Sequence, residues 1–185
     1  MISERIASRY ARALFGLALE KAQLEDIYKD MVLLKEVCEN NSDFVHFLAS
    51  PVINHSKKVA VFKTLFVEKI TPLSFNFLTI LIKKRRELII REVAGEFVML
   101  YKVHHNIKTV YFQTASPVSE KNTEKLKNAL GKQLSSEIEL IQTVNPNLIG
   151  GFIFKVDDLQ YDATLRRNIN RLKKEYNINI YIPKF

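Results

Sequence analysis

The sequence predicts an α+β protein, with an N-terminal six-helix bundle in residues 1–105 followed by a small C-terminal α/β domain in residues 106–185. Through the first part, apolar residues recur at helical spacing, and Pro51 and Pro72 separate successive helical stretches. The alternation of apolar and polar residues that is typical of strands appears only in the second part. The chain has 185 residues, 47% of them apolar, with five Gly and five Pro, so it has enough apolar content to bury a core.

The first three helices follow from apolar stripes and from one proline. Residues 3–19 and 24–38 each place apolar side chains on one helical face. A short helix is expected over 44–48, after the cap residue Ser42. It should end at Ser50, because the residue before a proline is disfavoured in the helical conformation.

The next three helices complete the predicted bundle. One is expected over 57–67. The pair Thr71-Pro72 joins an N-cap residue to a proline at the first helical position, which predicts a helix over 72–85. An apolar stripe predicts the last helix over 87–103.

The second part combines strands with two helices. Val, Thr, Tyr and Phe dominate its first strand, and apolar–polar alternation marks the others. Ser119 is the expected N-cap of the first of the two helices. The expected strands are 108–114, 138–144, 152–156 and a late edge strand at 178–182. The expected helices are one that follows Ser119, with Leu126, Ala129, Leu130 and Leu134 on one face, and one over 161–176.

No catalytic, cofactor or metal site is expected. Gly150-Gly151 lacks the spaced glycines and the lysine of a phosphate-binding loop, and is better explained by a positive φ or a close backbone approach. His104-His105 is interpreted as a solvated hinge, and Cys38, on an apolar stripe, as an inert buried thiol. The aspartates near Asp157 fit turn and cap roles better than a divalent-metal site.

The first helix carries more apolar surface than a small bundle hides. Arg5, Arg9 and Arg12 share one narrow sector, while an apolar arc of roughly 200° is about twice as wide as burial on one side needs. The bulky flank of that arc consists of Ile6, Tyr10 and Leu17. The other flank is a shallow strip of Ala7, Ala11 and Ala18, which we interpret as a trough because small residues let a second helix come close.

The fifth helix is apolar almost all round, with only Asn76, Thr79 and Lys83 in its polar sector. Two interpretations remain open for it. It is either a central helix enclosed by the other five, or one wall of a groove that it shares with the first helix and that takes an amphipathic helix of a partner. A targeting role for the basic first helix is the weaker idea, because Glu4 and Glu20 count against it.

Four segments of this sequence resemble the F-type ATP synthase delta subunit family, which includes the mitochondrial oligomycin-sensitivity-conferring protein. They occur in the order and at the spacing of the family and together span nearly the whole chain. The segments are Ser8–Phe15, Leu48–Ile53 with Lys57, Phe77–Leu78 through Arg85-Arg86 and Leu88-Ile89, and Asn145–Phe152. The chain departs from the family at Ala163-Thr164, where Gly-Ser is usual, although Thr also supplies a hydroxyl.

The resemblance implies a non-catalytic stator component without a cofactor. Such a subunit binds the N-terminal helix of the alpha subunit and other subunits of the catalytic head. It joins that head to the C-terminal region of the b subunits in the peripheral stalk, and it resists rotor torque during proton-driven ATP synthesis. The partner-binding residues that it implies between the first and fifth helices are Ala7, Tyr10, Ala11, Leu14, Ala18, Phe75, Leu78 and Ile82.

The alternative function is a basic adaptor that associates with nucleic acid. It is motivated by the net charge of +8, the pI near 9.5 and a basic run near the C-terminus. The charge is spread evenly over both parts, so no nucleic-acid partner is expected. If Met1 begins the native fold, we expect a bacterial peripheral protein on the cytoplasmic face of the inner membrane, held there only through the complex. The basic run consists of Arg166, Arg167, Arg171, Lys173 and Lys174.

Overall fold

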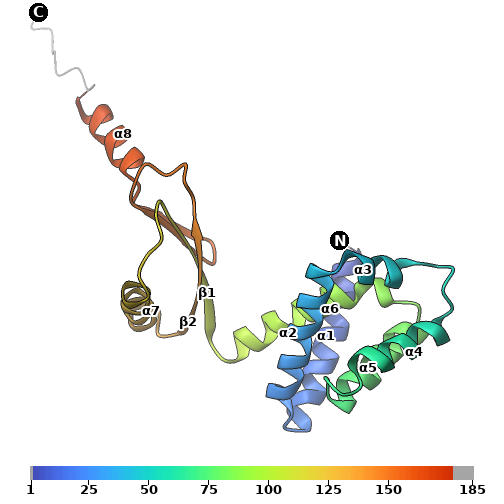
Figure 1. Ribbon diagram of the computed structural model, residues 1–185. Helices are drawn as coiled ribbons and strands as arrows, with labels where there is room; N and C mark the ends of the chain where they lie inside the picture. Colours follow the sequence, from blue (N-terminus) through green and yellow to red (C-terminus); the bar gives the residue numbers. More distant parts are fainter. Residues whose placement is uncertain (1, 177–185) are drawn as a thin grey trace, which may run out of the picture. The chain divides into compact units, whose positions relative to one another are not determined.

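The computed structural model describes residues 2–176 and has an α+β architecture. Its contacts divide the chain into two compact units, Met1–His104 and His105–Phe185 (Figure 1). No helix among the described residues is long and apolar enough to cross a membrane. The edge strand predicted over 178–182 lies outside the described residues.

The first unit is helical throughout, and its helices share one core. Most bounds agree with the sequence prediction within a few residues, because caps and prolines mark the ends. The predicted last helix instead begins as a 3₁₀ turn. The elements are α1 (Ile2–Glu20), α2 (Leu24–Asn40), α3 (Ser42–Ala49), α4 (His55–Phe66), α5 (Pro72–Lys83), the 3₁₀ helix η1 (Glu87–Ile89) and α6 (Ile90–His104).

The start of α5 confirms the predicted Thr71-Pro72 cap. Thr71 Oγ1 accepts a hydrogen bond from the backbone N–H of Ser74 at 3.3 Å. The buried carboxylate of Asp30 on α2 accepts two further bonds, from the Thr71 N–H at 2.9 Å and the Thr71 hydroxyl at 2.7 Å. One threonine therefore caps α5 and connects it to α2.

We expect Thr71→Ala to lower the free energy of unfolding by about 1–2 kcal/mol, because both hydroxyl bonds disappear and Asp30 stays buried with one donor fewer. Thr64→Ala is the control, since the Thr64 hydroxyl is exposed and bonds only within its own helix, to Ala60 O. Urea unfolding followed by circular dichroism measures both. Equal stability of the two variants would contradict the assigned role of Thr71.

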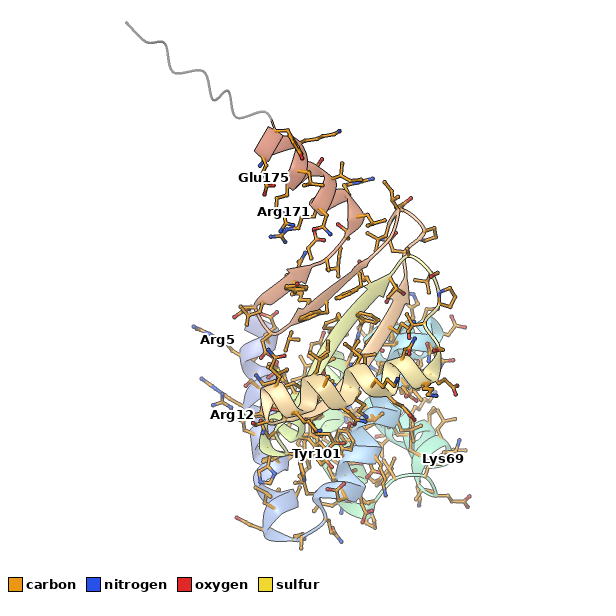
Figure 2. All side chains as sticks on the ribbon, turned by 90° about the vertical axis from the view of Figure 1, so that its left-hand side faces the viewer. Arg5, Arg12, Lys69, Tyr101, Arg171 and Glu175 are labelled. Carbon is orange, nitrogen blue, oxygen red and sulfur yellow. The ribbon has the colours of Figure 1, made fainter. Side chains whose placement is uncertain are left out.

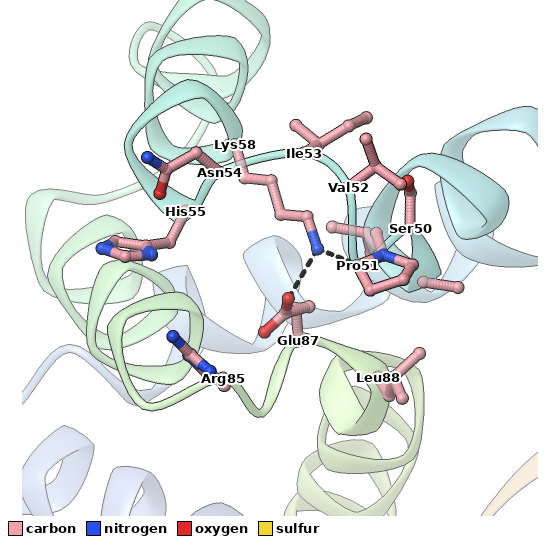
Figure 3. A pocket seen from close by; sticks show the side chains of 12 residues that line it. Ser50, Pro51, Val52, Ile53, Asn54, His55, Lys58, Arg85, Glu87 and Leu88 are labelled. Atoms are coloured by element: carbon pink, nitrogen blue, oxygen red, sulfur yellow. Dashed lines mark hydrogen bonds and ion pairs between the residues drawn. The ribbon is translucent and has the colours of Figure 1, made fainter.

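A buried lysine joins three elements of the first unit. Lys58 on α4 is 2% exposed, and its Nζ lies 2.6 Å from the carbonyl oxygen of Leu48 at the end of α3 and 2.6 Å from Glu87 Oε1 in η1 (Figure 3). The Lys57 that we matched to the family segment is exposed instead. The lysine that is buried and paired is thus Lys58, one residue further along α4 than Lys57.

The second unit is a four-stranded sheet with order β2-β1-β3-β4. Strands β1 and β2 are parallel and are linked by α7, while β3 pairs antiparallel with both β1 and β4. Val110, Leu130, Ile138 and Val156 form the small core between α7 and the sheet. The elements are β1 (Ile107–Thr114), α7 (Glu120–Leu134), β2 (Glu137–Val144), β3 (Phe152–Val156), β4 (Leu159–Asp162) and α8 (Leu165–Tyr176).

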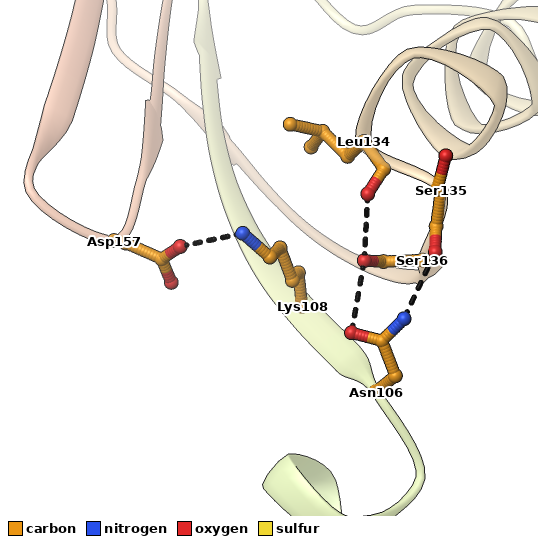
Figure 4. A network of polar contacts seen from close by, with 6 residues as sticks. All are labelled: Asn106, Lys108, Leu134, Ser135, Ser136 and Asp157. Atoms are coloured by element: carbon orange, nitrogen blue, oxygen red, sulfur yellow. Dashed lines mark hydrogen bonds and ion pairs between the residues drawn. The ribbon is translucent and has the colours of Figure 1, made fainter.

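Polar contacts join the start of β1 to the end of α7. Asn106 Nδ2 donates to the carbonyl of Ser135 at 2.9 Å, and the Ser136 hydroxyl lies 3.1 Å from Asn106 Oδ1 (Figure 4). Lys108 of β1 reaches the other way, with its Nζ 3.0 Å from Asp157 Oδ2 in the β3–β4 turn. The Asn106 contacts thus hold the crossover between the two parallel strands in place, and the Lys108 ion pair ties β1 to the β3–β4 turn.

The predicted helix over 161–176 is wrong in its first four residues. Tyr161 and Asp162 belong to β4, which pairs with β3, and α8 begins only at Leu165. The ring of Tyr161 stacks on Phe154 with a centroid distance of 5.1 Å. Cross-strand pairing and aromatic stacking therefore outweigh the helical spacing that the sequence shows there.

Candidate partner-binding surface

The structure contradicts part of the predicted site between α1 and α5. Six of the eight residues are buried within the chain, and the alanines are fully buried. Tyr10 and Phe75 are partly exposed. The prediction that the alanine strip offers an open trough to a partner helix is therefore wrong. The buried residues are Ala7, Ala11, Leu14, Ala18, Leu78 and Ile82.

The reason is that α6 of the same chain occupies the alanine face of α1. These two helices lie side by side in the first unit (Figure 1). Phe97 of α6 is fully buried, and its ring contacts Phe15 of α1 with a centroid distance of 5.7 Å. Small residues on α1 do admit a second helix closely, as the sequence suggested, but that helix is intramolecular.

The basic sector of α1 points away from the core, as predicted. Arg5 and Arg12 extend from the helix into solvent (Figure 2). The bulky flank of α1 stays apolar at the surface, where Leu17 is 44% exposed and Ile6 and Tyr10 are partly exposed. Ala13, which is exposed, lies on the same flank. Successive residues of this flank lie one helical turn apart, so they form a continuous strip.

Helix α5 resolves into a buried face and an apolar outer flank. Leu78, Leu81 and Ile82 are buried, whereas Ile80 is 51% exposed. Leu73 and Phe77 are partly exposed and lie on the same side of the helix as Ile80. The interpretation of α5 as an enclosed central helix thus holds for one face only, and the groove for a partner helix stays a prediction.

Aromatic contacts join these flanks of α1 and α5. The rings of Tyr10 and Phe77 meet edge to face, with centroids 6.3 Å apart. The guanidinium carbon of Arg86 lies 5.5 Å from the centre of the Tyr10 ring. We call this surface the α1–α5 strip. It consists of Ile6, Tyr10, Ala13 and Leu17 of α1 with Leu73, Phe77 and Ile80 of α5.

The sequence prediction counted Ala13, Leu73, Phe77 and Ile80 in the apolar surface of the two helices but left them out of the partner-binding residues. The bulky flank of α1 was visible on the helical wheel, but the alanine strip was preferred because small residues favour close packing. A helical wheel shows that two flanks of a helix are apolar. It does not show which of the two flanks is covered by the rest of the same chain. Packing against α6 decides that question.

The described residues offer no cluster for metal binding. No group of three or more His, Cys, Asp or Glu side chains that could hold a metal ion occurs among residues 2–176. Burial raises the pKa of the Cys38 thiol to about 11, so this side chain is protonated at neutral pH and unreactive. Cys38 therefore packs as a small apolar residue, as the sequence predicted.

A pocket of about 520 Å³ lies beside the buried Lys58, between the α3–α4 loop and the turn before η1 (Figure 3). Val52 and Leu88 expose apolar side chains at its edge. The Lys58 Nζ is already bound to Leu48 O and Glu87 Oε1. The pocket therefore surrounds a structural ion pair.

An exposed apolar strip on a helical unit is typical of a protein that binds other proteins. The family model described as "ATP synthase delta (OSCP) subunit" matches residues 6–176. This chain belongs to that family. It is thus a non-catalytic structural component of the F-type ATP synthase, with roles in ATP synthesis, ion transport and the peripheral stalk.

Similar proteins support this assignment over nearly the full chain. The ATP synthase subunit delta of Cytophaga hutchinsonii is 31% identical over 95% of this chain and 96% of its own. That of Christiangramia forsetii is 30% identical over 100% of both chains. A chain of the mitochondrial ATP synthase hexamer of Toxoplasma gondii has the same fold, with a TM-score of 0.72 and 24% identity over 94% of this chain and 98% of that one.

Proposed function

We propose that this chain links the catalytic head of the F-type ATP synthase to its peripheral stalk and resists rotor torque during proton-driven ATP synthesis. In this proposal α1–α6 act as one six-helix bundle that binds the N-terminal helix of the alpha subunit and touches other head subunits. The second unit contacts the C-terminal region of the b subunits. The complex holds the chain at the cytoplasmic face of a bacterial inner membrane, with no nucleic-acid partner.

The observation that carries this proposal is the exposed apolar α1–α5 strip in a member of this family. Each large apolar side chain that moves from water into a contact contributes roughly 1.5–3 kcal/mol. An amphipathic helix, with apolar residues at three- and four-residue spacing, has the shape to cover a strip between two helices. Tyr10, Leu17 and Ile80 are the exposed anchors for such a helix.

The predicted site residues take two roles in this proposal. Tyr10 is partly exposed and lies in the strip, so it remains able to contact the alpha-subunit helix, whereas the partly exposed Phe75 lies on the other side of α5. The six buried residues act indirectly, by holding α1 and α5 in position beneath the strip. The partner helix would thus contact the bulky flank of α1, not the alanine flank.

Binding of a synthetic alpha-subunit N-terminal peptide to the full chain tests the proposal. We expect Leu17→Glu and Ile80→Glu each to raise the Kd about 10- to 100-fold, because each removes one buried apolar contact from the complex. The matched control is Met99→Glu, since Met99 is 63% exposed on α6, outside the strip. Calorimetry measures the affinities, and thermal unfolding checks that all variants are folded.

Unchanged peptide affinity in folded Leu17→Glu and Ile80→Glu variants would refute this docking site. The alternative adaptor function makes the opposite prediction. In that case the chain would bind bulk nucleic acid tightly, would lose this binding steeply with added salt, and would ignore the alpha-subunit peptide.

A further inference from the structure

A second pocket lies in the sheet unit, at the carboxyl end of β1. Its volume is about 740 Å³, and it is bounded by the end of the sheet, the first half of α7 and the loop before β3. This volume is within the range of about 300–1,000 Å³ that is typical of small-molecule sites. All three segments contribute to its apolar lining, which consists of Phe112, Val118, Leu126, Leu148, Ile149 and Phe152.

A buried hydroxyl group without a hydrogen-bond partner belongs to the wall of this pocket. Thr114 lines the pocket and is only 5% exposed, and its side chain is on the same face of β1 as those of Val110 and Phe112. Thr114 Oγ1 makes no hydrogen bond to any of the described residues. Such unpaired buried atoms are few in native proteins, because leaving them unpaired is costly. The pocket therefore offers a hydrogen-bonding position that the described chain does not use.

The lining also indicates the charge of a fitting ligand. The other polar side chains of the pocket are those of Ser116 and Asn122, and both are exposed. None of the lining residues is charged, although 26% of the residues of the chain are. A charged ligand would lose hydration without gaining a counter-charge from the lining. The pocket thus suits an uncharged molecule.

Apolar side chains that a ligand would cover lie beside the unpaired hydroxyl. The rings of Phe112 and Phe152 have their centroids 5.7 Å apart, and Phe152 pairs with Thr114 between β1 and β3. Ile149 of the loop is 69% exposed. Covering large apolar side chains with apolar surface is favourable, and aromatic rings also attract other rings edge to face or offset. A largely apolar molecule with one hydroxyl group satisfies both the rings and Thr114.

The loop wall of the pocket is fixed by the segment that precedes α8. The Leu165 N–H donates to Gly150 O at 3.0 Å, and the Ala163 N–H donates to the carbonyl that begins β3 at 2.9 Å. A Cβ on Gly150 would lie 2.6 Å from Leu165 Cδ1. A Cβ on Gly151, whose φ is +83°, would lie 2.3 Å from Ala163 O. Since glycines let the loop lie this close, the wall is formed in advance, and less conformational entropy is lost on binding.

We propose that this pocket is a binding site for an uncharged, largely apolar small molecule with one hydroxyl group. The Thr114 hydroxyl forms a hydrogen bond with the hydroxyl of the ligand. The rings of Phe112 and Phe152 contact its apolar part from the sheet, and Leu148 and Ile149 contact it from the loop. This site goes beyond the linking function, which does not require it.

Three probes with one ring system test the proposal on the full chain, so that residues 177–185 are present. They are 2-naphthol, which has a hydroxyl group, naphthalene, which lacks it, and 2-naphthoate, which is charged. Nuclear magnetic resonance follows binding through the backbone amide signals of Gly150, Gly151 and Asn122. We expect 2-naphthol to shift these signals to saturation and naphthalene to bind about three- to tenfold more weakly. The charged 2-naphthoate should bind more weakly still.

Two variants separate the hydroxyl from the apolar lining. Thr114→Val is expected to weaken 2-naphthol binding about three- to tenfold and to leave naphthalene binding unchanged. It should also raise the urea midpoint, because an unpaired buried hydroxyl is removed. Ile149→Asp is expected to weaken both probes about tenfold, since an apolar contact is lost. Leu159→Asp is the matched control, because Leu159 is 76% exposed on β4 and does not line the pocket.

Failure of 2-naphthol to reach saturation on the full chain would overturn the proposal. Equal affinities of the wild-type chain for 2-naphthol and naphthalene would overturn it too, and this comparison needs no variant to fold. The alpha-subunit peptide and the purified C-terminal segment of the b subunit are added in parallel. Displacement of bound 2-naphthol by either would assign the pocket to a protein contact and reject the small-molecule site, whereas retention of 2-naphthol supports it.

Discussion

Replacing Ala11 by Arg is expected to unfold the helical unit or to lower its free energy of unfolding by about 3–5 kcal/mol. Ala11 is fully buried on the face of α1 that packs against α6. An arginine there would be overpacked, and its charge would be buried without a partner. Urea unfolding of the full chain measures this loss of stability. The unfolding is followed by circular dichroism at 222 nm, a standard wavelength for helix content.

Ala13→Arg is the control for this experiment. Ala13 is exposed on the same helix, two residues away, so its replacement is expected to change stability by less than about 0.5 kcal/mol. The same variant should weaken binding of the alpha-subunit peptide, because Ala13 lies in the α1–α5 strip. An Ala11→Arg variant as stable as Ala13→Arg would show that the alanine face is open and would restore the original sequence prediction.

Breaking the ion pair between Lys58 and Glu87 is expected to cost about 3–5 kcal/mol of stability. In Glu87→Ala the Lys58 ammonium, which is 2% exposed, keeps only the carbonyl oxygen of Leu48 as a partner. A buried charge without its counter-charge is strongly destabilising, whereas an intact pair is close to neutral when compared with apolar residues of similar volume. The cost therefore arises from the charge that is left behind.

A double variant separates this explanation from simple loss of packing. Lys58→Met combined with Glu87→Leu removes both charges and is expected to recover most of the stability that Glu87→Ala loses. Lys57→Met, at the exposed neighbouring position, is the matched control and should be close to neutral. If the double variant were less stable than Glu87→Ala, the bonds themselves and not the unpaired charge would hold α3, α4 and η1 together.

The Ser8–Phe15 segment shows how one motif serves several purposes. Its arginines Arg9 and Arg12 are exposed, whereas Ala11 and Leu14 belong to the core of the bundle. Tyr10 lies between these two environments and contacts Phe77. Only a part of the segment is therefore available to a partner, and the alanines contribute by letting α6 approach.

Local signals in the sequence predicted most of the fold because they act over a few residues. Thr71-Pro72 defined the start of α5, and Gly150-Gly151 indicated positions where a side chain does not fit, as the structure confirms. The residues 161–162 were assigned to a helix because their partners in β3 lie seven and nine positions away in the sequence. The helical periodicity of apolar residues is judged over a short stretch of sequence, so it carries no information about pairing with another strand.

By itself the sequence determined the α+β class, the change of period near His105, most of the helix boundaries and the apolar character of α1, α5 and α8. Only the tertiary structure decided which apolar face each helix covers, since that depends on neighbours distant in sequence. Helix α6 covers the alanines of α1, the bundle covers one side of α5, and no part of the described chain covers α8. Burial is a property of the assembled chain, so the surfaces left for partners become visible only when all intramolecular contacts are in place.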